Sequence, residues 1–179
     1  NTFFLVRYVG VNPQTGDAEW LDRNGNITIA PTANDRVIVG DANPDFTGGI
    51  TNSFRYKNFD LNVFANFSYG NDILIDGLRF TDNMNGFYNK STNLLDFWTT
   101  PGQNAYAPSM SSPTLATFHQ RSTAQLRDGS FLRINNVTLG YNLPKDFIGK
   151  TKIFDSARIY FTATNLYTFK ADDLDGIDP

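Results

Sequence analysis

The chain has 179 residues and a net charge of −3, and 15% of its residues are aromatic. Its 15 basic residues are scattered, whereas a phosphate-binding surface needs clustered Lys and Arg, so we expect no nucleic-acid partner. The sequence contains no cysteine, which excludes disulfides, thiolate metal sites and cysteine nucleophiles. No apolar run approaches the roughly 20 residues that a transmembrane helix requires.

The acidic residues show an unusual bias. Of the 18 acids, 17 are Asp and only Glu19 is Glu, while Asn occurs 20 times and Gly 14 times. Asp, Asn and Gly favour turns and caps, whereas the plentiful Phe, Tyr, Thr, Val and Ile favour strands. This composition predicts an all-β chain with long polar loops.

In the first part of the chain, the sequence pattern predicts one strand near residues 3–10, followed by a long loop over residues 11–47. The loop contains two turn-rich segments, residues 12–16 and 22–26. These turns are placed to bracket a small hairpin that runs through Trp20.

Two long strands follow, near residues 49–57 and 59–70. In both, apolar and polar residues alternate with a period of two, which a helix cannot present as two separate faces. Only Lys57 and Asn58 separate the two runs, and Asn tolerates a positive φ. We therefore expect an antiparallel hairpin with a two-residue turn.

A second long loop is expected over residues 71–124. It contains one helical segment, Thr92–Thr99, which follows Ser91 and stops before Pro101. At eight residues this helix has two turns at most.

Further strands are predicted near residues 126–143 and 157–169. In the first of these, the apolar residues move from even to odd positions at Asn135 and Asn136. A β-bulge there would keep one face apolar, because one extra residue changes the side to which each later side chain points.

The connections between these strands alternate between short and long. Outer-membrane barrels have this asymmetry, with short periplasmic turns and long extracellular loops. A loop of about fifty residues is uncommon inside a compact soluble domain. The pattern predicts antiparallel up-and-down strands of a large transmembrane β-barrel wall, and a large sandwich with one functional insertion is the alternative.

Several strings of the sequence resemble the C-terminal region of the SusC/RagA-like TonB-dependent outer-membrane transporters. Their joint order and spacing, which cover nearly the whole chain, carry the resemblance. The strings are Gly10–Asp17 with Trp20, Gly40–Gly49, Tyr56–Leu61, Tyr69–Asp72, Asp128–Ile134, Val137–Pro144, Asn165–Leu166 and Gly176–Pro179.

The sequence departs from the family pattern in two ways. Phe97 precedes Trp98 where the family usually has Arg, which puts in doubt any contact made by that Arg. Relatives also continue past the Gly-x-Asp-Pro string into a final strand. The resemblance therefore implies a fragment, residues 1–179, that lacks the plug and the closing strand of a barrel of the 22-stranded type.

The resemblance implies that the parent protein imports nutrient oligomers, more plausibly glycans than peptides, across the outer membrane of a Gram-negative bacterium. It implies energy supplied by TonB through the missing N-terminal part, and a SusD-like lipoprotein seated on the extracellular loops. The surrounding partners would be the lipid bilayer and lipopolysaccharide. No cofactor, metal or catalytic residue is expected, so the chain is not read as an enzyme.

The alternation of residues divides the side chains between two faces, and the resemblance implies which face contacts lipid and which borders the lumen. Residues expected to face lipid are Phe59, Leu61, Val63, Phe67, Ile159 and Phe161. Residues expected to face the lumen are Asp60, Asn62, Asn66, Thr162 and Thr164. Tyr56, Tyr69 and Tyr141 fall near strand ends, where the aromatic girdles of barrels lie.

Aromatic residues in the Asn- and Asp-rich loops are the substrate-binding candidates, because such a mixture can stack on sugar faces and hydrogen-bond hydroxyl groups. They are Trp20, Phe87, Tyr88, Trp98 and Tyr106. Packing within the loops, or contact with a partner protein, is an equally good explanation. A soluble or surface lectin-like carbohydrate-binding β-protein is the alternative function.

Other possible sites are weaker. His119 is the only histidine, so a two-histidine metal site and a catalytic triad are not expected. The acidic string Asp172–Asp178 suggests calcium but lacks the twelve-residue spacing and terminal Glu of an EF-hand loop. A charged, solvated turn is sufficient explanation for it.

Overall fold

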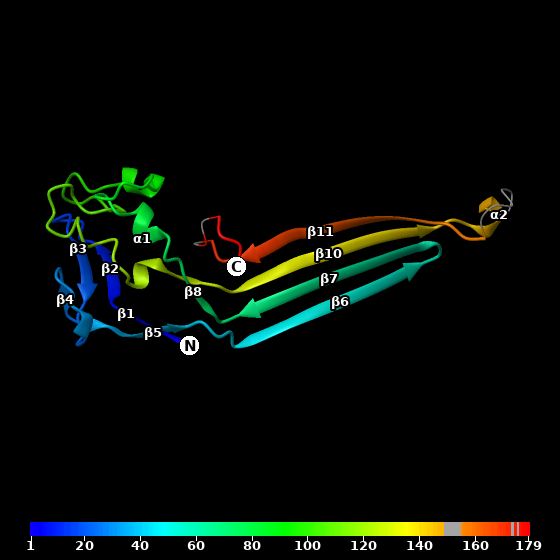
Figure 1. Ribbon diagram of the computed structural model, residues 1–179, viewed down its shortest axis with the longest axis horizontal. Coiled ribbons are helices and arrows are strands. Elements are labelled where there is room, and N and C mark those ends of the chain that lie inside the picture. The colour runs from blue at the N-terminus through cyan, green and yellow to red at the C-terminus, as the bar shows by residue number, and fades with distance from the viewer. Residues whose placement is uncertain (149–154, 173, 175) are drawn as a thin grey trace. The chain divides into compact units, whose positions relative to one another are not determined.

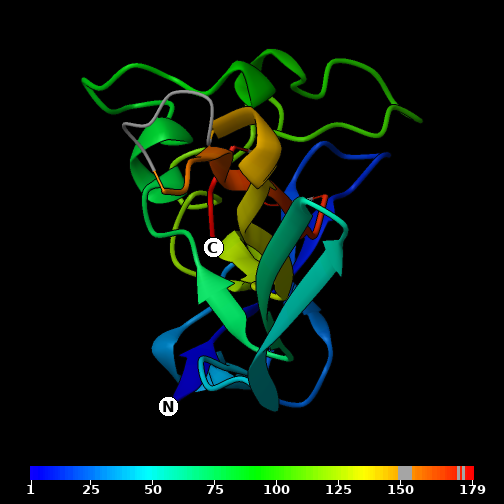
Figure 2. The same ribbon diagram turned by 90° about the vertical axis from the view of Figure 1, so that its right-hand side faces the viewer.

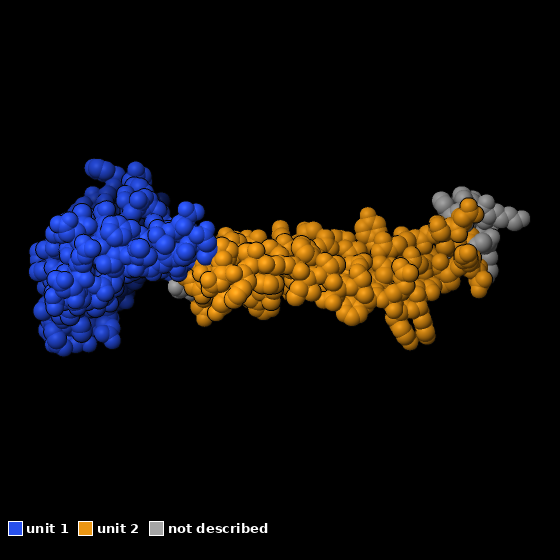
Figure 3. Space-filling view, turned by 90° about the horizontal axis from the view of Figure 1, so that it is seen from below, with its two compact units in different colours: residues 1–43, 72–127 blue, residues 44–71, 128–179 orange. Residues whose placement is uncertain are grey.

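The computed structural model of the chain describes residues 1–148, 155–172, 174 and 176–179. The chain forms two compact units, coloured separately in Figure 3. Unit 1 comprises residues 1–43 and 72–127, and unit 2 comprises residues 44–71 and 128–179.

Almost all of the regular structure is β-strand. The strands are β1 Thr2–Leu5, β2 Arg7–Val11, β3 Ala18–Leu21, β4 Ile27–Thr28, β5 Val37–Asp41, β6 Phe46–Tyr56, β7 Phe59–Tyr69, β8 Asp72–Leu74, β9 Leu126–Asp128, β10 Phe131–Asn142 and β11 Arg158–Lys170. The short helices are η1 Ala33–Asp35, α1 Leu78–Thr81, η2 Thr92–Leu95, η3 Thr123–Gln125 and α2 Lys145–Ile148.

Unit 2 is built on a four-stranded antiparallel sheet in the order β11-β10-β7-β6 (Figure 1). Each strand pairs with its neighbour along nearly its whole length. The turn between β6 and β7, visible in Figures 1 and 2, contains Lys57 with a φ of 51° and Asn58. The expected hairpin is confirmed, although β6 begins at Phe46, before the expected residue 49.

The expected bulge in the third long strand, β10, is also present. It shifts the register of β10 with both of its neighbours, β7 and β11. Asn135 is an extra residue in β10 relative to β7, where Ile134 pairs with Ala65 and Asn136 with Phe64. Relative to β11, the same Asn135 faces the stretch between Tyr167 and Thr164. Within that stretch Asn165 adopts a φ of 49°, a conformation that Asn tolerates better than most residues.

Unit 1 contains the β1-β5, β2-β3-β4 and β8-β9 pairings. The hairpin expected around Trp20 is confirmed, because Trp20 lies in β3 between β2 and β4. A small core forms around this strand. It comprises Val6, Ala18, Trp20, Leu94, Ala107 and Phe118, with Tyr8, Met84, Phe97 and Tyr106 packed against it.

Several expected elements differ from the structure, among them the loop over residues 71–124, which contains β8 and α1. The strand near residues 3–10 is divided at Val6 into β1 and β2, because the two halves pair with different partners. The strand near residues 126–143 is interrupted at Gly129 and Ser130, and the helix at Thr92–Thr99 is only the 3₁₀ turn η2. The segment expected as a loop over residues 11–47 contains β3, β4 and β5.

Among the described residues, no helix has the length and apolar character needed to cross a membrane.

Candidate functional site

Most apolar side chains of the unit 2 sheet lie on one face, because the pairing aligns them in rows across the strands, whereas Phe64, Phe131 and Tyr160 lie on the other face. The rows are Tyr56, Phe59, Tyr141 and Ile159; Phe54, Leu61, Leu139 and Phe161; Asn52, Val63, Val137 and Ala163; Ile50, Ala65, Ile134 and Tyr167; and Gly48, Phe67, Leu132 and Phe169. Asn52 interrupts this face, and nothing in the structure explains it.

This face is exposed although it is apolar. Phe161 is 71% exposed, Ile159 67% and Phe54 60%. Monomeric soluble proteins rarely leave so extensive an apolar surface uncovered. The six residues expected to face lipid all lie on this face.

Aromatic residues border the apolar face at both ends of the strands. At the β6–β7 turn, the rings of Phe59 and Tyr141 lie 4.6 Å apart. At the other end, Phe46 and Tyr69 stack at 5.7 Å. The ten residue steps from Phe59 to Tyr69 cover about 33 Å along the strand, or about 25 Å at a tilt of about 40°, which is the height of a barrel's apolar band.

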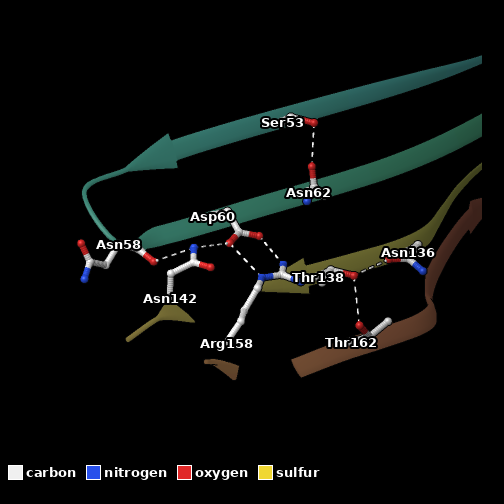
Figure 4. Close-up of polar contacts among 9 residues, drawn as sticks. All are labelled: Ser53, Asn58, Asp60, Asn62, Asn136, Thr138, Asn142, Arg158 and Thr162. Atoms are coloured by element: carbon white, nitrogen blue, oxygen red, sulfur yellow. Dashed lines mark hydrogen bonds and ion pairs between the residues drawn. The ribbon is translucent and has the colours of Figure 1, made fainter. Parts of the chain in front are cut away.

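The opposite face carries polar side chains that bond to one another (Figure 4). Arg158 forms an ion pair with Asp60, and Asn142 Nδ2 donates to Asp60 Oδ1 over 3.2 Å. Further along the sheet, Ser53 Oγ donates to Asn62 Oδ1 over 2.6 Å. The five residues expected to face the lumen, Asp60, Asn62, Asn66, Thr162 and Thr164, all lie on this face.

Gly140 makes room for the Asp60–Arg158 pair. It lies in β10 opposite Asp60, and a Cβ atom there would stand only 2.7 Å from Asp60 Oδ1 and from Arg158 Nε. This arrangement was not predicted from the sequence. The available signal was the glycine inside a strand, which often marks a close approach of neighbouring groups.

The end of the chain bonds to the polar face. Arg133, in β10, forms an ion pair with Asp178 and donates from Nη2 to the Pro179 carbonyl oxygen over 2.7 Å. Asp178, which belongs to the acidic string considered for calcium, thus pairs with the Arg133 guanidinium. The cation expectation also involved Asp173 and Asp175, which lie outside the described residues.

The five aromatic residues expected to bind substrate fall into two groups. Phe87 and Tyr88 are exposed, at 107% and 65%. Trp20 is only 2% exposed, because it lies in the core of unit 1, although it is among the residues that line a cavity of that unit.

The other two aromatic residues support the loops. Trp98 Nε1 donates to the Pro13 carbonyl oxygen over 2.9 Å, and its ring occupies the space that a Cβ atom on Gly16 would need. Tyr106 donates its hydroxyl hydrogen to Asp82 Oδ2 over 2.6 Å. In these contacts both side chains hold distant parts of unit 1 together.

Burial shifts the ionisation of the groups around Tyr106. It raises the pKa of the Asp82 carboxyl, and the hydrogen bond from Tyr106 partly opposes this change. Burial also raises the pKa of Tyr106, with a further contribution from Asp82. It lowers the pKa of His119, so this histidine favours its neutral form.

Within the described part of the chain, no group of three or more His, Cys, Asp or Glu side chains is arranged to hold a metal ion.

Comparisons with known proteins identify relatives along most of the chain, although no protein-family model matches it. A TonB-dependent receptor P3 of Formosa agariphila is 38% identical over 160 residues, which are 89% of this chain and 15% of that protein. The TonB-dependent receptor SusC of Bacteroides thetaiotaomicron is 28% identical over 180 residues, covering 100% of this chain and 17% of SusC.

Solved structures give the same result for the fold. A structure of the RagAB peptide transporter matches 94% of this chain and 19% of that chain, with a TM-score of 0.79 and 27% identity. The RagAB peptide importer in its open-open state matches with a TM-score of 0.80 and 27% identity over 96% of this chain and 19% of that chain. The chain thus spans less than a fifth of the length of these relatives.

Proposed function

The chain is homologous to part of the SusC/RagA-like TonB-dependent receptors, and we propose from this premise that it forms wall and extracellular loops of an outer-membrane importer of nutrient oligomers. The observation that carries the proposal is the sheet of unit 2. Its apolar face extends across four strands with an interruption at Asn52, while its other face carries polar side chains that hydrogen-bond to one another.

In this proposal the apolar face contacts lipid and lipopolysaccharide, and the polar face borders the lumen. A lipid-embedded strand needs every backbone group paired, which the ladders of β7 and β10 supply on both sides. The outer strands β6 and β11 each have one side without a partner among the described residues. Further strands of the parent barrel would pair there.

Unit 1 is proposed to lie on the extracellular side, where a SusD-like lipoprotein would seat. Energy would come from TonB acting on a part of the protein outside this chain. The exposed pair Phe87 and Tyr88 are the best remaining candidates for contact with a substrate or with that lipoprotein. Glycan is the proposed substrate class, and the name of the RagAB peptide importer makes an oligopeptide the alternative.

The experiment is an uptake assay with the full-length protein in its host. Deleting the gene should abolish accumulation of one class of fluorescent oligosaccharide, and a protonophore that removes the energy for TonB should have the same effect. A plasmid copy of the gene should restore uptake. Unchanged uptake of every oligosaccharide and oligopeptide in the deletion strain would contradict the proposal.

The lectin-like alternative predicts different behaviour. A soluble carbohydrate-binding protein would have to cover the apolar face of unit 2, and it would stay in solution without detergent. Extraction of the full-length protein only with detergent, from outer-membrane fractions, is the expected result.

A further inference from the structure

Unit 1 contains a cavity of about 820 Å³ whose charge differs from that of the chain as a whole. Three arginines, Arg36, Arg79 and Arg121, line it, and its described lining includes no Asp or Glu. The whole chain, in contrast, has 18 acids and a net charge of −3. Three of the 15 basic residues thus share one cavity that has no acidic residue in its described lining.

The carboxylate of Asp76 pairs with two of these three guanidinium groups. Asp76 accepts from Arg121 Nε over 2.6 Å and from Arg121 Nη2 over 2.9 Å, and it lies 3.6 Å from Arg79 Nε. Among the described residues, no hydrogen bond or ion pair engages the side chain of Arg36. The cavity thus keeps an excess of positive charge after its internal pairing is satisfied.

The rest of the lining suits a sugar ring. Phe80 lines the cavity, is 44% exposed and packs edge-to-face with Tyr88 at 5.7 Å between ring centroids. The Arg79 guanidinium lies 5.3 Å from the centre of the Phe80 ring, which restrains both side chains. Asn83, Thr117 and Gln120 add amide and hydroxyl groups to a lining that also includes His119 and apolar residues.

We propose that this cavity binds an acidic oligosaccharide, with its carboxylate or sulfate groups on Arg36, Arg79 and Arg121 and a sugar ring against Phe80. Guanidinium groups pair with such anions through two parallel hydrogen bonds. The partly exposed Phe80, which distinguishes this cavity from a simple anion site, favours a sugar over an acidic peptide. The inference rests on the proposed import function and names the substrate class.

The test uses the purified full-length transporter in detergent and isothermal titration calorimetry with three probes. These are tetragalacturonate, neutral maltotetraose and a tetraglutamate peptide. We expect tetragalacturonate to bind most tightly, and to bind more weakly as the salt concentration rises. Arg36→Gln should weaken its binding about tenfold, the usual effect of losing one charged hydrogen bond.

Arg23→Gln is the matched control, because Arg23 is an exposed arginine of unit 1 that does not line the cavity. It should leave the affinity for tetragalacturonate within about twofold of the unaltered protein. Phe80→Ala should also weaken binding, without changing the salt dependence. Preference for maltotetraose or tetraglutamate, or equal effects of Arg36→Gln and Arg23→Gln, would overturn the inference.

The outcome is separable from that of the import proposal. If the deletion strain loses uptake of a neutral oligosaccharide while tetragalacturonate does not bind, the import function stands and the acidic substrate class is wrong. If tetragalacturonate binds at the cavity while uptake is unaffected by deletion, the cavity is a binding site but the import proposal fails.

Discussion

Gly140 is the residue on which the Asp60–Arg158 pair depends. A side chain there would enter the space between the carboxylate and the guanidinium, so Gly140→Val should separate them and destabilise the sheet by about 1–3 kcal/mol, the usual cost of overpacking. The measurement is the temperature at which the full-length barrel loses its heat-modifiable mobility on gels. Gly77→Ala is the control, since nothing lies within 4 Å of a Cβ atom there.

The raised pKa of Asp82 predicts that the stability of unit 1 depends on pH. Because burial raises its pKa in the folded state, the folded chain binds more protons than the unfolded chain. Stability should therefore fall as the pH rises from the ordinary value of 3.8 through the raised pKa. Asp82→Asn keeps an acceptor for Tyr106 and should remove this fall, as measured by thermal unfolding followed through tryptophan fluorescence.

Asp35 is the control, because its pKa is shifted in the opposite direction from that of Asp82. Hydrogen bonds from Thr32 lower the pKa of its carboxyl, so its contribution to stability is present above pH 3.8 and is lost as the pH falls through the lower folded-state pKa. Asp35→Asn should thus reduce stability near neutral pH and leave it unchanged in strong acid. The same direction of change for both variants would contradict the assignment of Asp82.

At the scale of the strand, neighbouring residues of β7 should tolerate charge very differently. Val63 lies on the apolar face near the middle of the strand, and Asn62 lies on the polar face. If the apolar face contacts lipid, Val63→Arg should cost about 2–4 kcal/mol and reduce the amount of folded barrel in the membrane. Asn62→Arg should be nearly neutral, and equal loss in both variants would show that the faces are assigned wrongly.

The strands show which features a single sequence determines. Period-two alternation located the β6–β7 hairpin, and the change of parity at Asn135 located the bulge, because both are local patterns. The division of residues 3–10 into β1 and β2 depends on which distant strand pairs with each half. Local sequence carries no such information.

The loop residues show the same limit. Composition identified an aromatic-rich surface, but it could not distinguish Trp20 in the core from Phe87 on the surface. The cavity arginines were missed because Arg36, Arg79 and Arg121 are far apart in the sequence and come together only through the fold of unit 1. The only local signal was one basic residue in each of three polar segments, which many loops share.

For the whole molecule, the central expectation is that unit 1 faces the outside of the cell and the β6–β7 turn faces the periplasm. The absence of cysteine from this chain allows single cysteines to be introduced into a full-length protein whose other cysteines, if any, are replaced. Phe87→Cys should react with a membrane-impermeant maleimide on intact cells, because Phe87 is fully exposed. Lys57→Cys, in the turn, should react only after the outer membrane is permeabilised.

The two variants act as controls for each other, because both place a thiol at an exposed position of the same protein. Long extracellular loops and short periplasmic turns are the general rule for outer-membrane barrels. Labelling of Lys57→Cys on intact cells, with Phe87→Cys protected, would show that the barrel has the opposite orientation in the membrane. Since the cavity arginines belong to the same unit as Phe87, that result would also remove them from the path of an incoming nutrient.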